Sequence, residues 1–358
     1  MKTSDSRQRI LATLNRQPTD RTPVDIWCTP EITDLLREHT GKSDELEMYH
    51  ALGLDKIVWV SPDYTSVSSD PNLPGAGRTR WGVPTRTVKS GAATYDENVG
   101  APLADFDDPK QIDDYPLWPD PDKFDYAGAR QRALKARELG FATIGPWVSH
   151  FEVYCHMRGL ENAMMDVIAE PDFLNAALDR IEANQTAMLE RYFAVMGDAL
   201  DIVFISDDMG SQTSLLISLP AWDTFLRERL VRWCDLIHKH GKKVLFHTDG
   251  AARDLVPRLI TAGIDILNPI QHICPGMDRA GLKRDFGDQV IFHGGVENQH
   301  VLPFGSPEDV VAEVKACLET LGQGGKGYIC SSCHNIQAGT PLKNILAMIE
   351  TVLQSRPA

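Results

Sequence analysis

The sequence contains no apolar run near the roughly 20 residues needed to span a bilayer. Its first twenty residues lack the apolar core of a secretory signal and instead resemble an amphipathic helix with Ile10, Leu11 and Leu14 on one side. Positive charge is also scarce: 36 Lys and Arg against 50 Asp and Glu give a net charge of −14 over 358 residues. This balance argues against nonspecific binding to nucleic acid or to anionic membranes.

Cysteines are too few and too scattered for a disulfide framework. There are seven, an odd number, spread between Cys28 and Cys333. Without a secretory signal, this pattern favours free thiols in a reducing cytoplasm. The pair Cys330-x-x-Cys333 has no second pair to complete a zinc knuckle, and it lies at an expected strand, whereas redox pairs usually open a helix. We therefore predict a cytoplasmic protein without disulfides.

A dinucleotide-binding fingerprint is missing too, because no G-x-G-x-x-G follows an expected strand. Short Val- and Ile-rich runs do recur, and helical stretches separate most of them. The expected strands are Pro23–Cys28, Lys56–Val60, Ala142–Trp147, Asp201–Ser206, Lys243–His247, Ile264–Asn268, Gln289–Gly294 and Gly327–Ser331. Eight such units predict an α/β protein with a (β/α)₈ TIM barrel, and a doubly wound open sheet is the alternative.

Three expected helices have clear boundaries. Residues 174–195 have helical spacing, residues 220–240 begin with a proline and end before a glycine, and residues 306–321 begin with a serine cap, a proline and two acids.

Residues 61–125 depart from the alternation, since they are rich in Pro, Asp and Gly and contain no long helix. We predict a pair of strands there, Arg80–Val88 and Ala93–Asn98, followed by a polar crossover. Long excursions of this kind usually serve as lids or interface arms. The whole chain, 1–358, is thus expected to be one domain with an insertion after the second strand.

Polar side chains collect where the expected strands end, which is the catalytic face of a barrel. His247 and Asp249 are two residues apart and would point the same way from a strand, so both could reach one ion. His334, with Cys333 beside it, could complete the site from the last strand. His, carboxylate and thiolate are all zinc ligands. The metal candidates are therefore His247, Asp249, Cys333 and His334, unless His247 only hydrogen-bonds to Asp249 or to the backbone.

The other strand-end residues are assigned to catalysis or to cofactor binding. The catalytic candidates are Asp207, Asp208, Glu152 and His293. The cofactor-binding candidates are Gln212, Asn268, Glu297 and Asn335. For the two adjacent aspartates, capping of the following turn remains an alternative to a role in the pocket, and His293 could be a packed strand histidine.

Several stretches resemble the uroporphyrinogen decarboxylase superfamily, in its methyltransferase-like branch. They include RTPVDIW, LGLDK, FISDDMGSQTSLLISLPAW, HTDGAARDLVPRLITAGIDILNPIQ, GGVENQHVLPFGSPEDVVAEV and CHNIQAGTPLKNILAM. The resemblance implies a (β/α)₈ barrel. Its methyltransferase members use zinc, held by an H-x-C pair and a late cysteine, to move methyl groups to or from a corrinoid that is often carried by a partner protein.

Residue by residue, His247 matches the histidine of the methyltransferases, while Asp249 and His334 stand where they have cysteines. Harder ligands make a poorer activator of thiols, but they remain compatible with zinc. The resemblance thus implies a zinc methyltransferase that acts between a small substrate, such as a methoxylated aromatic, and a corrinoid protein.

Two alternatives remain open. His334 also matches the late histidine of the decarboxylases, and Asp208 lies near a pocket position of that family, so a decarboxylase or lyase with a smaller substrate is the second hypothesis. No arginine lies between Arg21 and Arg37, where the decarboxylases carry their arginine-rich motif. The third hypothesis is a barrel that binds a corrinoid or tetrapyrrole without catalysis. The oligomeric state is left open, a homodimer included.

Overall fold

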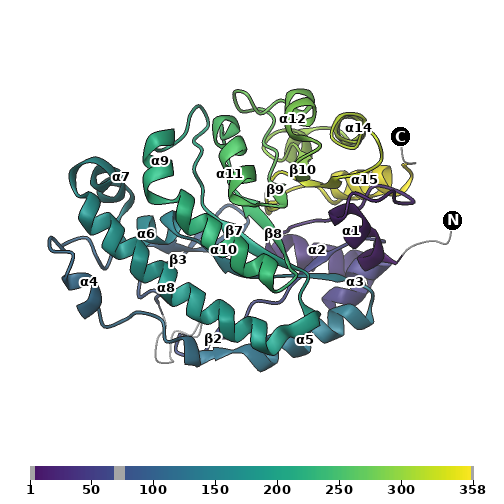
Figure 1. Cartoon of the computed structure of the whole chain (residues 1–358). Helices are drawn as coiled ribbons and strands as arrows, with labels where there is room; N and C mark the ends of the chain where they lie inside the picture. The colour runs from purple at the N-terminus through teal and green to yellow at the C-terminus, as the bar shows by residue number, and fades with distance from the viewer. Residues whose placement is uncertain (1–4, 68–76, 356–358) are drawn as a thin grey trace.

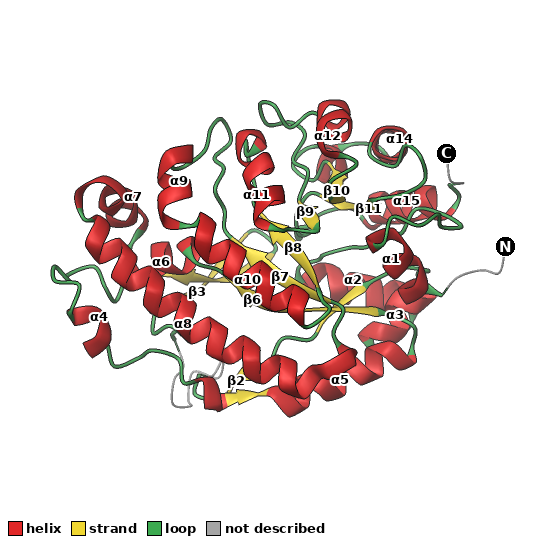
Figure 2. Ribbon diagram, viewed as in Figure 1, coloured by secondary structure: helices red, strands yellow, loops and turns green. Residues whose placement is uncertain are grey.

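The computed structural model describes residues 5–67 and 77–355. Parallel strands curl into one sheet surrounded by helices (Figure 1, Figure 2). In spatial order they are β1 (Ile57–Trp59), β6 (Ala142–Val148), β7 (Ile202–Ser206), β8 (Lys243–His247), β9 (Ile266–Asn268), β10 (Ile291–Val296) and β11 (Tyr328–Ser332). This is the α/β sheet of a TIM barrel, so the predicted fold class is confirmed.

The first expected strand along the chain, residues 23–28, does not form a regular strand. It nevertheless closes the barrel, because it lies between β11 and β1. A parallel backbone bridge joins Val24 to Cys330 of β11. On the other side, the amide of Asp55 donates to the carbonyl of Val24 at 2.7 Å. One step further along the segment, Lys56 Nζ donates a hydrogen bond to the carbonyl of Ile26 at 2.6 Å. A side chain therefore takes over part of the pairing that a backbone ladder makes elsewhere in the barrel.

Alternate residues of each strand fill the interior of the barrel, because side chains alternate between the two faces of a strand. The inner cluster comprises Ile57, Ala142, Ile144, Ile202, Phe204, Leu245, Ile266, Ile291 and Ile329, with Ile10 and Leu14 of the first helix. Trp27, Trp59 and Trp147 pack against this cluster. The rings of Trp59 and Phe204 lie 4.8 Å apart and those of Trp27 and Phe204 5.8 Å apart. Together Trp27, Trp59, Trp147 and Phe204 form an aromatic floor beneath the mouth of the barrel.

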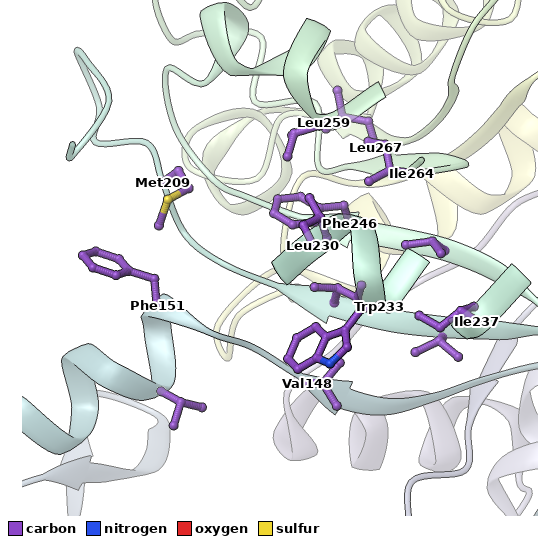
Figure 3. Packing of buried hydrophobic residues seen from close by; sticks show 14 of the residues in the cluster. Val148, Phe151, Met209, Leu230, Trp233, Ile237, Phe246, Leu259, Ile264 and Leu267 are labelled. Atoms are coloured by element: carbon purple, nitrogen blue, oxygen red, sulfur yellow. The ribbon is translucent and has the colours of Figure 1, made fainter. Parts of the chain in front are cut away.

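Outward-facing strand residues pack against the helices. Figure 3 shows Trp233 and Ile237 beside Val148 and Phe246, and all four are almost completely buried. The helices are α1 (Ser6–Leu14), α2 (Pro30–Thr40), α3 (Glu45–Ala51), α5 (Tyr126–Glu138), α6 (Phe151–Arg158), α7 (Leu160–Ala169), α8 (Pro171–Met196), α9 (Leu219–Phe225), α10 (Arg227–Lys239), α11 (Val256–Ala262), α12 (Arg279–Phe286), α13 (Val301–Phe304), α14 (Pro307–Thr320) and α15 (Leu342–Leu353), with short 3₁₀ turns η2 (Gly197–Ala199) and η3 (Arg253–Leu255).

The expected helix boundaries hold with one exception. Ser306 caps α14 as predicted, because its hydroxyl accepts from the amide of Asp309. The single helix expected over 220–240 is wrong: α9 and α10 are separate helices. Leu226 interrupts them with φ −117° and ψ −30°, away from ideal helical values.

The excursion at 61–125 contains β2 (Asp63–Tyr64), β3 (Thr85–Ser90), β4 (Ala93–Asn98), α4 (Gln111–Asp114), η1 (Pro121–Lys123) and β5 (Phe124–Asp125). The antiparallel hairpin β3–β4 confirms the expected strand pair, although β3 begins at Thr85 instead of Arg80. β2 pairs with β5, so both ends of the excursion meet. Residues 68–76 of this expected insertion lie outside the described residues, and its role as a lid stays a prediction. No helix in the described part of the chain is long and apolar enough to cross a membrane.

Candidate metal centre

Three predicted ligands meet at the mouth of the barrel. His247, the last residue of β8, points inward above the aromatic floor, and Asp249 follows in the loop. His334 comes from the loop after β11. One ligand atom from each of the three residues lies within 4.8 Å of the others. His247 Nε2 is 4.0 Å from Asp249 Oδ1, and His334 Nε2 is 3.9 Å from Asp249 Oδ2.

A buried hydrogen-bond chain sets the orientation of the His247 ring. Its Nδ1 lies 2.5 Å from Asn268 Oδ1, which can only accept, so Nδ1 carries the proton. The lone pair of a neutral His247 is then on Nε2, which faces Asp249. The amide nitrogen of Asn268 donates to Nδ1 of His293 at 2.7 Å. Asn268 therefore fixes the tautomers of two histidines.

The chain continues to a charged pair inside the barrel. His293 Nε2 donates to Asp25 Oδ2 at 3.1 Å, and Lys56 Nζ lies 3.0 Å from Asp25 Oδ1. Burial alone would raise the pKa of Asp25, but Lys56 and His293 outweigh burial, and the pKa is lowered. An ionised Asp25 therefore anchors the far end of the relay, which runs through Lys56, Asp25, His293, Asn268 and His247. Carboxylate-linked histidines of this kind are typical supports of metal ligands.

Burial favours the neutral forms of the more exposed ligands. It raises the pKa of Asp249, although His247 opposes the shift, and it lowers the pKa of His334, although Asp249 opposes that shift. A neutral imidazole can ligate a cation, and a bound cation would in turn stabilise the carboxylate.

Glu152 lies at the edge of the cluster. Its Oε2 accepts a hydrogen bond from Ser206 Oγ at 2.7 Å. Burial raises the pKa of Glu152 to about 7, and Asp208 and Asp207 add to the shift. Asp208 Oδ1 is 3.7 Å from His247 Nε2 and accepts from the amide of Asp249 at 3.0 Å. The predicted catalytic residues Glu152 and Asp208 are thus beside the ligands.

Other predicted residues are engaged elsewhere. Asp207 accepts from the amides of Phe151 and Glu152 at 2.7 and 2.9 Å and from Ser149 Oγ at 2.8 Å, which caps α6. Glu297 accepts from three successive amides at the start of α13. Asp207 therefore caps α6, the helix after β6, and not the following turn that the capping alternative named; Glu297 caps the start of α13 in the same way.

The structure also separates the neighbours Cys333 and His334. Cys333 is buried, and its Sγ donates to the carbonyl of Ile270 at 3.0 Å, away from the three converging ligands. Gln212 is exposed and accepts from Gln271 Nε2 at 3.2 Å. Asn335 lines a cavity of about 250 Å³ beside Trp27 and Trp59. Asn268 and His293 are fully buried members of the relay and do not face this cavity.

Asp25, Lys56 and Ser206 were missed as site-supporting residues by the sequence reasoning. Asp25 carried a signal: it is a carboxylate in the middle of an expected strand, PVDIWC, where an apolar residue is normal. A charged residue at an inward-facing strand position requires a buried partner.

Comparisons with known proteins agree with this architecture. The sequence profile described as "Uroporphyrinogen decarboxylase (URO-D)" matches residues 85–354. The chain belongs to the uroporphyrinogen decarboxylase family. A uroporphyrinogen decarboxylase from Alkalilimnicola ehrlichii is 27% identical over 379 residues, which cover 98% of this chain and 94% of the relative. Among solved structures, a methyltransferase from Methanosarcina mazei superposes with a TM-score of 0.70 at 19% identity, covering 98% of this chain and 99% of that one. This second likeness shows the shared fold.

Proposed function

We propose that this URO-D family member is a zinc-dependent methyltransferase that moves a methyl group between a small substrate, expected to be a methoxylated aromatic, and a corrinoid. The observation that carries the proposal is the convergence of His247, Asp249 and His334 at the barrel mouth. The likeness in fold to a protein named as a methyltransferase supports the same choice.

The donor set fits zinc. Two imidazoles and a carboxylate leave a fourth position open, as in catalytic zinc sites. Ligand atoms about 2.0–2.1 Å from one tetrahedral ion lie about 3.4 Å apart. One ligand atom from each of the three residues lies within 4.8 Å of the others, so the separations would have to shorten by up to about 1.4 Å, which side-chain rotations of Asp249 and His334 in their loops can supply. The Nε2 lone pair of His247, oriented by Asn268, is already available.

The residues around the cluster have distinct roles in this proposal. Zinc, when bound by His247, Asp249 and His334, supplies a Lewis acid toward a substrate oxygen or sulfur. Glu152, with a pKa of about 7, can hold or release a proton near neutral pH. Asp207 acts indirectly, because its bonds to the start of α6 position Glu152. The aromatic floor gives a flat substrate an apolar surface, and methyl transfer depends mainly on such positioning.

A corrinoid protein is the proposed partner. Exposed apolar side chains lie in the segments that follow β7, β9 and β10, on the same side of the barrel as the candidate ligands. They are Leu216, Ile273 and Phe304, and the last is 82% exposed. A contiguous apolar patch is typical of a surface that binds another protein, and these three residues are the candidates for such a patch.

A decarboxylase is the second candidate, and the 27% identical relative favours it. In that case Asp208 and His334 would be the acid and base groups and no metal would be required. A non-catalytic corrinoid-binding barrel is the third.

Metal analysis and turnover discriminate among these candidates. We expect near-stoichiometric zinc in the purified protein, its loss in His247→Ala and its retention in His300→Ala, an exposed control histidine. We also expect demethylation of methylcobalamin or methylation of cob(I)alamin. A metal-free protein that releases CO₂ from a substrate would establish the decarboxylase. Corrinoid binding without methyl transfer in either direction would establish the third candidate.

A further inference from the structure

Arg80 lies in the excursion between β2 and β3 and reaches back to the barrel. Its guanidinium donates to the carbonyl of Trp147 at 3.1 Å, near the C-terminal end of β6. The carbon of the guanidinium is 5.6, 5.9 and 5.7 Å from the ring centres of Trp81, Phe124 and Trp147. Three aromatic side chains thus surround the cation.

Arg80, which is half-buried, differs from the deeply buried arginines of the chain. Arg9, Arg158 and Arg229 each form an ion pair with an aspartate. Within residues 5–67 and 77–355, no carboxylate pairs with Arg80, and the carbonyl of Trp147 is its one hydrogen-bond acceptor. Desolvation alone lowers the pKa of Arg80 to about 10. A cation that aromatic rings desolvate in this way is stabilised when a ligand supplies a counter-charge.

The free side of Arg80 faces a cavity. The cavity has a volume of about 160 Å³, and Arg78 and Lys123 also line it. Among the lining residues that the structure describes, Asp120 is the one acidic residue, and its carboxylate lies 3.9 Å from Lys123 Nζ. The lining therefore has excess positive charge in a chain of net charge −14.

The position links this cation to the metal centre. Trp147 stands beside Phe204 in the register of β6 and β7, and the Phe204 ring is 5.6 Å from the His247 ring. Trp147 and Phe204 therefore lie between Arg80 and the candidate ligand His247. A molecule lying on the aromatic floor would have the ligands at one end and a guanidinium at the other.

We infer that Arg80 binds a carboxylate of the substrate, so that the substrate is a small aromatic acid. A guanidinium presents paired N–H donors that match a carboxylate, and the surrounding rings favour an aromatic body. The inference rests on the proposed function, which it deepens by naming the anionic group.

The experiment measures binding of two matched probes, 4-methoxybenzoate and neutral 4-methoxybenzyl alcohol, by calorimetry on the full chain. We expect the acid to bind at least about tenfold more tightly to the wild type, as charge-assisted hydrogen bonds generally allow. Arg80→Met should abolish this preference. Arg86→Met, which removes an exposed cation of β3 that does not line the cavity, should retain it.

Circular dichroism and thermal unfolding establish that each variant is folded. If Arg80→Met does not fold, Arg80→Lys serves instead, and it should lose most of the preference because an ammonium cannot make the paired contact. A wild type without preference for the acid, or a folded Arg80 variant that keeps it, overturns the inference. Zinc content and methyl transfer are measured separately. A preference for the acid without zinc therefore refutes the proposed function alone, and zinc-dependent transfer without the preference refutes this inference alone.

Discussion

Replacement of Asn268 by alanine should weaken zinc binding more than its distance from the ion suggests. Asn268 joins two buried histidines, accepting from His247 and donating to His293. The alanine would leave both ring nitrogens without partners, at about 1–3 kcal/mol each, so we expect a loss of about 2–6 kcal/mol in the free energy of unfolding. Because His247 would also lose its fixed tautomer, zinc affinity should fall about 10–100-fold.

Asn344→Ala is the matched control. Asn344 is as buried as Asn268, and its amide donates to the carbonyls of Leu302 and Gly305, both at 2.9 Å, away from the ligands. Urea unfolding should show destabilisation in both variants, whereas competition with a chromophoric chelator should show weaker zinc binding only for Asn268→Ala. Equal zinc affinities in the two variants would refute the positioning role of the relay.

Three further predictions concern individual side chains. Burial raises the pKa of Glu152 from 4.5 to about 7 in the folded protein. The stability that protonated Glu152 contributes is therefore fully present below pH 4.5 and should be lost as the pH rises through about 7. The loss should be about 3 kcal/mol and should be smaller in Glu152→Gln; equal pH profiles from chemical unfolding would contradict this. Cys333→Ala should keep its zinc and His334→Ala should lose it, as metal analysis would show, since Cys333 donates to Ile270 instead; the reverse result would make the thiol the ligand. Asp207→Ala should unfold about 2–4 kcal/mol more easily, because it leaves the start of α6 without its acceptor, and an unchanged midpoint in urea would exclude the capping role.

The sequence was sufficient to predict the barrel and the inward orientation of His247 at the end of β8. A strand that ends at His247 places it inward on the same face as Leu245, and the period-two alternation of strand residues is enough to predict this orientation. His247 and His334 were expected at one rim, and their ring centres lie 5.7 Å apart. Their role as zinc ligands stays a prediction.

The remaining contacts depend on packing that no local pattern encodes. His293 meets Asp25 across 268 positions of the chain, and only the closed barrel brings them together. Whether Cys333 or His334 faces the mouth could not be decided, since β11 ends at Ser332 and alternation ends with the strand. For Asp207 the sequence suggested a cap only on the following turn, whereas the cap that it forms is on α6, whose donors come from a different β–α loop.

The bridge between Val24 and Cys330 also has a consequence for biosynthesis. Residues 23–28 are the first barrel segment to leave the ribosome. Their neighbour β11 is synthesised only about 300 residues later. Until then the nascent sheet has two free edges, and such edges invite pairing with other chains. His334 emerges in the same final stretch, so the ligand set cannot be completed before the barrel is ready to close.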